Sequence, residues 1–263
     1  ISYAAISHHC QVMVEYYRLT AVDRILQFAP LHVDASLEQL LPGLLCGASV
    51  LLSDRQIWQP WEFWDWISHH RISIVDLPPS YLHELLRQWQ QCDAPDLPPA
   101  LRLVISGGEA VSAETVSLWR RSPLHCIPLL NAYGPTETTI TSTVFAIDDS
   151  VADDRLAETV PIGRPLPGEQ AYILESGGQP APVGVIGELY IGGAGLADDY
   201  WQRPELSRQK FIDNPFMTGN RLYKTGDLAR WSADGFIEFI GRIDEQIKIR
   251  GFRVECGEIE AAL

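Results

Sequence analysis

The sequence is poor in basic residues and has no long apolar run. Its 263 residues include 20 lysines and arginines against 34 aspartates and glutamates, which gives a net charge of −14. Without a basic excess to release counterions, neither nucleic acid nor an anionic membrane is expected as the main partner. No apolar stretch approaches the roughly 20 residues that span a bilayer. No signal or transit peptide is visible at the N-terminus.

Several motif classes are missing as well. There is no CxxC pair, no P-loop, no GxSxG elbow and no internal repeat. Gly193 and Gly195 do not begin a dinucleotide fingerprint, because Asp198 stands where its last glycine belongs. The histidine pairs are adjacent rather than three to five residues apart, so we expect no zinc site. The five scattered cysteines predict reduced thiols and a cytoplasmic location.

Helical and strand patterns alternate through the first half of the chain. Leucines at helical spacing in 37–45 predict a helix with one apolar face, and 48–52 reads as a buried strand. Further strands are predicted at 72–75, 101–105 and 126–130, separated by helices, which indicates a parallel α/β sheet. Aromatic residues at 61–66 are interpreted as core packing.

The polar residues that end these strands point to one pocket. Asp76, Ser106 and Asn131 each lie at or just beyond a strand end. In parallel α/β sheets, ligands bind beyond the carboxyl ends of the strands. From about residue 144, short strand-like runs alternate with Gly/Pro turns, which predicts a smaller β-rich layer or distorted barrel.

We therefore predict three parts. Residues 1–143 form an α/β core with the pocket, residues 144–243 form the β-rich part, and residues 244–263 begin a further small subdomain. Both ends look cut, since the sequence stops inside what looks like a new helix, so we expect a fragment.

The stretch NAYGPTETT, residues 131–139, has the side chains that a nucleotide requires. Tyr133 offers a ring, Thr136 a hydroxyl and Glu137 a carboxylate for Mg²⁺, in a turn enforced by Gly-Pro. Near the C-terminus, Asp227 lies in a Thr-Gly turn, where it could accept hydrogen bonds from ribose hydroxyls, and Arg242 precedes Asp244. The alternatives are a polar β-turn for the first stretch and a surface salt bridge for the second.

Four motifs together resemble a known family. NAYGPTETT, GELYIGGAGLADDYWQRPELSRQKFI, LYKTGDLARW and GRIDEQIKIRGFRVE occur in the order and at the spacing of adenylation domains of nonribosomal peptide synthetases. These domains belong to the adenylate-forming superfamily of acyl-CoA synthetases and luciferases. The resemblance covers nearly the whole chain. It implies the adenylate-forming fold, with a parallel-sheet α/β core followed by a β-rich subdomain.

The resemblance also implies a reaction and its partners. An α-amino acid and ATP would give aminoacyl-AMP and pyrophosphate, with Mg²⁺. The aminoacyl group would then pass to the phosphopantetheine thiol of a peptidyl carrier domain, beside a condensation domain. By this resemblance, Asn131 and Tyr133 would contact adenine, and Asp227 and Arg242 would bind the ribose. Thr136 would contact the α-phosphate, and Glu137 would bind Mg²⁺. Phe239 and Gly107 would pack against the nucleotide. Thr136, Glu137 and Arg242 would be catalytic, and Asp244 would be the hinge.

The amino-acid pocket follows by the same resemblance. Asp34 matches the position that pairs with the substrate α-ammonium, although it also stands where a helix N-cap belongs. The remaining wall positions would be Ala35, Glu38, Asp76, Val104, Ser106, Ala132, Ile140 and Thr141. Glu38 and Asp76 would repel each other in a desolvated pocket unless a cation lies between them. We therefore predict a basic substrate: arginine, lysine or ornithine.

Some features depart from the family. The phosphate loop expected before Ile1 and the lysine expected near the end of the small subdomain are not in the sequence, so we expect the chain itself to adenylate weakly or not at all. Val33 replaces a usual aromatic gate. The alternatives are an acyl- or aryl-CoA ligase, which Asp34 argues against, and a non-catalytic nucleotide-binding fragment.

Overall fold

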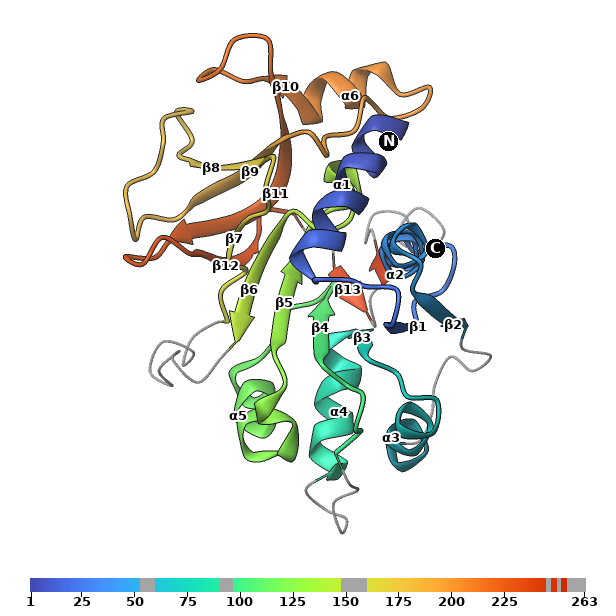
Figure 1. Cartoon of the computed structure of the whole chain (residues 1–263). Helices are drawn as coiled ribbons and strands as arrows, with labels where there is room; N and C mark the ends of the chain where they lie inside the picture. The colour runs from blue at the N-terminus through green and yellow to red at the C-terminus, as the bar shows by residue number, and fades with distance from the viewer. Residues whose placement is uncertain (53–59, 90–96, 148–159, 245–246, 250–251, 255–263) are drawn as a thin grey trace, which may run out of the picture.

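Two large β-sheets, a short two-stranded sheet and the helices packed beside the large sheets make up the described part of the molecule (Figure 1). The computed structural model describes residues 1–52, 60–89, 97–147, 160–244, 247–249 and 252–254. A seven-stranded sheet is built from the first part of the chain, and a five-stranded antiparallel sheet follows it. The predicted fold class is confirmed.

The seven-stranded sheet has the order β2-β1-β3-β4-β5-β6-β7. The first five strands of this order are parallel, β6 is antiparallel to β5, and β7 is antiparallel to β6. Their bounds are β1 Arg24–Gln27, β2 Ser49–Leu52, β3 Ile74–Leu77, β4 Leu103–Gly107, β5 Leu129–Tyr133, β6 Thr143–Ile147 and β7 Arg164–Pro165. The sheet thus ends at β7, beyond residue 143, where we had drawn the first boundary.

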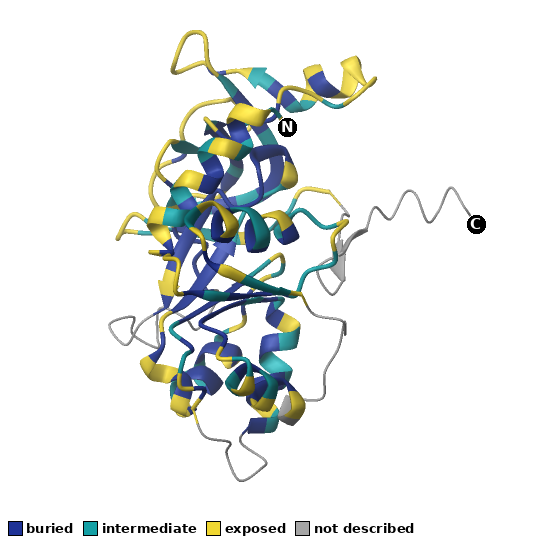
Figure 2. Cartoon of the chain, turned by 45° about the vertical axis from the view of Figure 1, so that its right-hand side comes forward, coloured by how far each residue is buried: buried dark blue, intermediate teal, exposed yellow. Residues whose placement is uncertain are grey.

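Helices cover both faces of this sheet. On one face lie α3 (Pro60–His69), α4 (Pro79–Trp89) and α5 (Ala113–Arg121), whose apolar side chains form one core cluster with the strand residues Val75 and Val104. On the other face, α1 (Tyr3–Tyr16) packs beside α2 (Ala35–Cys46), and a second cluster includes Ile74 and Ile105. The strands between the helices are buried, whereas the helices show exposed outer faces (Figure 2). Neighbouring residues on each strand therefore point to opposite faces of the sheet.

The aromatic residues that follow Pro60 are core packing, as predicted. Phe63 and Trp64 are buried on α3, and the Trp64 ring lies edge-on to the ring of Trp89 with 4.7 Å between centroids.

The five-stranded sheet consists of β8 (Glu169–Leu174), β9 (Gly187–Gly193), β10 (Phe211–Asp213), β11 (Arg221–Trp231) and β12 (Ile237–Arg242), with β11 at its centre. The helix α6 (Pro204–Lys210) precedes β10. A separate pair is formed by β13 (Ile247–Ile249) and β14 (Phe252–Val254). Most of the predicted third part, 244–263, lies outside the described residues.

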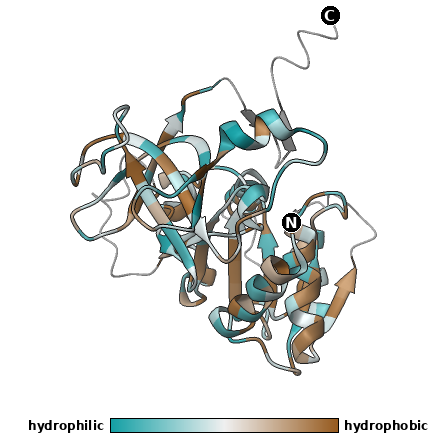
Figure 3. Cartoon of the chain, turned by 90° about the horizontal axis from the view of Figure 1, so that it is seen from above, coloured by the Kyte–Doolittle hydropathy of each residue, from teal (hydrophilic) through white to brown (hydrophobic). Residues whose placement is uncertain are grey.

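The burial predicted for α2 and β2 was wrong. Leu44 and Leu45 of the leucine stripe are 59% and 67% exposed, and β2 is a partly exposed edge strand. Instead, α2 buries Glu38 and Gln39 on the side that faces α1 and β3. Figure 3 shows hydrophobic residues, in brown, along parts of the helices as well as along the inner strands. The spacing of apolar residues predicted the helix but not which of its sides is buried, because the buried side carries polar residues.

Candidate active site

A cavity of about 820 Å³ opens where β3, β4 and β5 end, next to β11 and β12. Its volume is typical of small-molecule sites. It brings together twelve residues that the sequence had assigned to substrate or nucleotide: Asp34, Ala35, Glu38, Asp76, Gly107, Ala132, Tyr133, Thr136, Ile140, Thr141, Asp227 and Arg242. The pocket thus forms at the carboxyl ends of the parallel strands, where the topology rule puts it.

Two predicted wall positions on β4 need correction. Val104 is fully buried in the core that faces α4 and α5, and the Ser106 hydroxyl donates to the Leu77 carbonyl at 2.9 Å. The cavity is lined instead by Ile105 and Gly107. The prediction was one residue out of register, and in a strand such a shift moves every side chain to the other face.

A polar chain joins the two sheets where Tyr133, Asp227 and Arg242 line the cavity. The Tyr133 hydroxyl donates to Asp227 Oδ2, and Arg242 Nη1 lies 2.5 Å from Asp227 Oδ1. Arg242 also donates to both oxygens of Asp244, at 2.6 and 2.8 Å. Burial and the Asp227 charge hold the pKa of Tyr133 well above its usual value, so its hydroxyl stays protonated and remains a donor.

Two residues predicted to contact the nucleotide lie behind the cavity wall. Asn131 is buried, and its Nδ2 donates to the Pro161 carbonyl at 2.8 Å. Phe239 packs with Tyr133 against the apolar cluster of the second sheet. In this structure, both residues pack behind the cavity wall.

The carboxylate of Glu137 is held by a residue that sequence reasoning missed. The Tyr200 hydroxyl donates to Glu137 Oε1 at 2.6 Å and lies 3.3 Å from the Tyr223 hydroxyl. The Ala197 amide donates to the Glu137 carbonyl at 2.9 Å. Glu137 is a single hard oxygen ligand, which fits Mg²⁺, an ion that retains several waters and phosphate oxygens. No cluster of three metal-type ligands occurs within the part of the chain that the structure covers.

The loop after Glu137 is strained. Thr139 and Ile140 both have positive φ, 60° and 70°, which is an outlier for β-branched residues. The Thr139 hydroxyl donates to the Gly195 carbonyl at 2.6 Å, and this bond holds the conformation. A Cβ on Gly134 would lie 2.0 Å from the Ile140 carbonyl oxygen, so the turn requires glycine there. The strain directs Ile140 onto the cavity wall.

Asp34 does not cap α2. It precedes the helix, but its side chain makes no capping hydrogen bond. Its Oδ2 accepts from the Thr136 hydroxyl at 2.5 Å instead, and both residues line the cavity. The alternative of a simple N-cap is therefore excluded for Asp34 in this structure.

The two acids of the predicted substrate pocket have different surroundings. Glu38 accepts from His9 Nε2 and from the Tyr17 hydroxyl, each at 2.7 Å. Burial raises the pKa of Glu38, but bonds from His9, Tyr17 and Thr141 outweigh it, so the pKa is lowered. Asp76 accepts from Gln39 Nε2 at 3.1 Å. Burial and the Glu38 charge raise the pKa of Asp76 to about 7.

His9, Tyr17 and Gln39 were not singled out from the sequence. Their only signal is weak: each is a polar residue on the buried side of its helix or at its end. Phe28 and Tyr81 were also missed, and their stacked rings, 5.0 Å apart, line the cavity.

Comparison with known proteins identifies the family of the chain. Residues 1–201 match the family model of AMP-binding enzymes, and the chain belongs to that family. No helix in the described ranges has both the length and the hydropathy needed to cross a membrane.

Within this family the similarity is to peptide synthetases, which confirms the resemblance predicted from the motifs. The chain is 42% identical over 248 residues to tyrocidine synthase 1 of Brevibacillus parabrevis (94% of this chain, 21% of the relative) and 42% identical over 246 residues to gramicidin S synthase 1 of Brevibacillus brevis (93% and 21%). It therefore spans about a fifth of the length of these relatives.

Solved structures of adenylation domains are also similar to this chain. The Vibrio cholerae adenylation domain AlmE, in complex with glycyl-adenosine-5′-phosphate, is 31% identical with a TM-score of 0.85, over 99% of this chain and 48% of that one. A nonribosomal peptide synthetase protein with adenylation and PCP domains, bound to a vinylsulfonamide inhibitor, is 30% identical with a TM-score of 0.82, over 93% and 41%.

Proposed function

We propose that this chain carries the amino-acid and nucleotide sites of an adenylation domain that activates an α-amino acid with ATP. A substrate carboxylate oxygen attacks the α-phosphorus, the bond to pyrophosphate breaks, and aminoacyl-AMP forms. One observation carries the proposal: a single cavity is lined by Asp34 on one side and by Tyr133, Asp227 and Arg242 on the other. Both substrates can then meet in one cavity.

The residue roles follow from this arrangement. Asp34 would bind the α-ammonium, Thr136 the α-phosphate, and Asp227 with Arg242 the ribose and developing charge. Mg²⁺ would be held by Glu137 and would neutralise phosphate charge when bound. Adenine contacts by Asn131 and Phe239 require small shifts from their positions behind the wall. Asp244, bonded to Arg242, remains our proposed hinge.

The substrate is proposed to be basic. Two acids, the buried Glu38 and the partly exposed Asp76, lie on the part of the wall away from Tyr133, Asp227 and Arg242. Neutral substrates would leave their repulsion uncompensated, whereas a cationic side chain would relieve it.

The aminoacyl group is proposed to pass to the phosphopantetheine thiol of a carrier domain. The adenylation–PCP protein among the similar structures supports this partner, and the multimodular relatives support a neighbouring condensation domain. The free thiols of Cys10, Cys46 and Cys126 support a reducing, cytoplasmic setting.

Amino-acid-dependent ATP–pyrophosphate exchange tests the proposal. The protein assayed should carry this chain together with the phosphate loop and terminal lysine that the family resemblance calls for. We expect exchange with lysine, ornithine or arginine to exceed that with leucine or phenylalanine by at least about tenfold. Preference for leucine or phenylalanine would refute the basic substrate alone.

The same assay separates the alternatives. Activity with fatty or aryl acids and coenzyme A, without any amino acid, would favour an acyl- or aryl-CoA ligase. Absence of exchange with every amino acid, despite measurable AMP binding, would favour a non-catalytic nucleotide-binding protein.

A further inference from the structure

The two acids of the cavity, Glu38 and Asp76, differ in how many hydrogen bonds they can still accept. A carboxylate has about four lone-pair sites. Glu38 already uses about three of them for His9, Tyr17 and Thr141, so it can accept about one more bond. Asp76 accepts a side-chain bond from Gln39 and retains about three sites.

These bonds lock the position of Glu38. Its two oxygens are each 2.7 Å from a donor, His9 on α1 and Tyr17 directly after it, and all three residues are buried. Glu38 therefore cannot turn both oxygens towards a ligand without breaking two charge-assisted bonds in a dry environment, which is costly.

The space behind the acids is nearly closed. A void of about 10 Å³ lies among Tyr17, Glu38, Gln39 and Asp76, backed by Leu19, Ile25 and Ile74. This is at the lower limit for a single water molecule. A side-chain head group must therefore end at the two acids, on the cavity side.

We infer that the cavity selects an amino acid whose side chain ends in a primary ammonium group, and that His9 and Tyr17 select against a guanidinium by occupying Glu38. The inference rests on the proposed function. An ammonium has three N–H donors, which one site on Glu38 and two on Asp76 can satisfy. A guanidinium has five donors, which exceeds the roughly four acceptor sites that remain on the two acids together, so at least one of its buried N–H groups would lack a partner on these acids.

The first test compares lysine, ornithine and arginine in the exchange assay, with norleucine as the uncharged counterpart of lysine. We expect kcat/KM for lysine or ornithine to exceed that for arginine by about tenfold or more, since buried N–H groups without partners weaken binding. Arginine activated as well as or better than both would overturn the inference while leaving a basic pocket intact.

Other outcomes separate this inference from the proposals on which it rests. Norleucine equal to lysine would overturn the cationic site altogether, and the ammonium preference with it. Absence of exchange with any amino acid would overturn the adenylation proposal itself, and isothermal titration calorimetry with lysine and arginine would then still report whether the cavity discriminates between the head groups.

The second test frees Glu38. Tyr17→Phe removes a single oxygen, and His9→Leu removes the other α1 donor. Each should shift the arginine-to-lysine ratio of kcat/KM towards arginine by at least about fivefold. Tyr16→Phe is the matched control, because the neighbouring hydroxyl makes no bond to Glu38. Circular dichroism checks that each variant folds. If His9→Leu does not fold, Tyr17→Phe alone tests the inference. A ratio unchanged in Tyr17→Phe would contradict the role of α1.

Discussion

At the scale of single residues, the site depends on carboxylates in unlike environments. Asp34 accepts from Thr136, Glu38 from α1, Glu137 from Tyr200, and Asp227 from Tyr133 and Arg242. Each acid is held in one orientation by a donor from another element. Such fixed acids can respond to substrate charge without first reorganising.

Asp76 should give the protein a pH-dependent stability. Its pKa of about 7 in the folded protein exceeds the ordinary 3.8, so between about pH 4 and 7 the folded state binds more protons than the unfolded chain. The free energy of unfolding should therefore fall as pH rises through that window. Asp76→Asn should remove this contribution and be more stable than the wild type at pH 8, by roughly 2–4 kcal/mol.

Urea unfolding at several pH values between 5 and 8 measures this effect. Asp198→Asn, on an exposed residue, is the control and should keep the wild-type pH dependence. If Asp76→Asn shows the same slope as the wild type, Asp76 is ionised throughout and the environment described for it is wrong.

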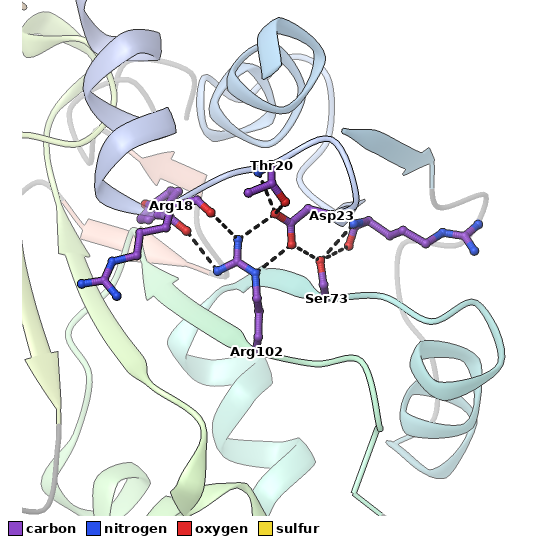
Figure 4. Close-up of polar contacts among 7 residues, drawn as sticks. Arg18, Thr20, Asp23, Ser73 and Arg102 are labelled. Carbon is purple, nitrogen blue, oxygen red and sulfur yellow. Dashed lines mark hydrogen bonds and ion pairs between the residues drawn. The ribbon is translucent and has the colours of Figure 1, made fainter. Parts of the chain in front are cut away.

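At the scale of elements, a second ion-pair network lies away from the cavity, at the amino ends of the parallel strands (Figure 4). Asp23 accepts from Thr20, from Ser73 just before β3, and from Arg102 just before β4. Arg102 also donates to the carbonyls of Tyr17 and Arg18 in the turn after α1. This network ties α1, β1, β3 and β4 together, and so fixes α1 against the sheet.

Asp23→Asn should destabilise the fold by about 1–3 kcal/mol, because it removes a buried carboxylate that accepts from Arg102, Ser73 and Thr20. Burial raises the pKa of Asp23, but the bonds from Arg102, Ser73 and Thr20 hold it well below its usual value. This stabilisation is present above about pH 4 and is lost as pH falls further. The urea midpoint measures the loss.

The control is Glu84→Gln, which breaks the exposed pair of Glu84 with Arg87 on α4. That change should stay within about 0.5 kcal/mol. Equal effects of the two substitutions would show that the Asp23 network contributes no more than a surface pair.

At the scale of the whole molecule, the nucleotide side of the cavity is shared between the two sheets. Tyr133 and Thr136 follow or belong to β5, whereas Asp227 and Arg242 come from β11 and β12. A bound nucleotide would therefore stabilise the relation between the sheets as well as each sheet alone.

We expect AMP to raise the melting temperature of the chain, by an amount that corresponds to about 2.7 kcal/mol when AMP is at 100 times its Kd. Arg242→Gln should lose most of this shift. Arg230→Gln is the matched control: Arg230 pairs with Glu238 across the same two strands, but neither residue lines the cavity. Differential scanning calorimetry with and without AMP measures the change in melting temperature of each variant. Equal changes in Arg242→Gln and Arg230→Gln would argue against Arg242 as a nucleotide contact.

The sequence by itself determined the class of fold and most of the site. Alternating apolar helices and strands predicted a parallel sheet, and residues at the carboxyl ends of β3, β4 and β5, among them Asp76, Gly107 and Tyr133, meet at one edge of it. The motifs around Tyr133, Asp227 and Arg242 identified the family, because their residue types and spacing follow the chemistry of a nucleotide.

Only the tertiary structure decided which side of each element faces the site. Ile105 rather than Val104 lines the cavity because strand register is set by pairing with β3 and β5. α2 presents Glu38 inward and its leucines outward because His9 and Tyr17, far away in the sequence, provide buried donors for that acid. Long-range hydrogen bonds of this kind leave no local periodicity, and so the chain's sequence did not reveal which of its two pocket acids remains open to a ligand.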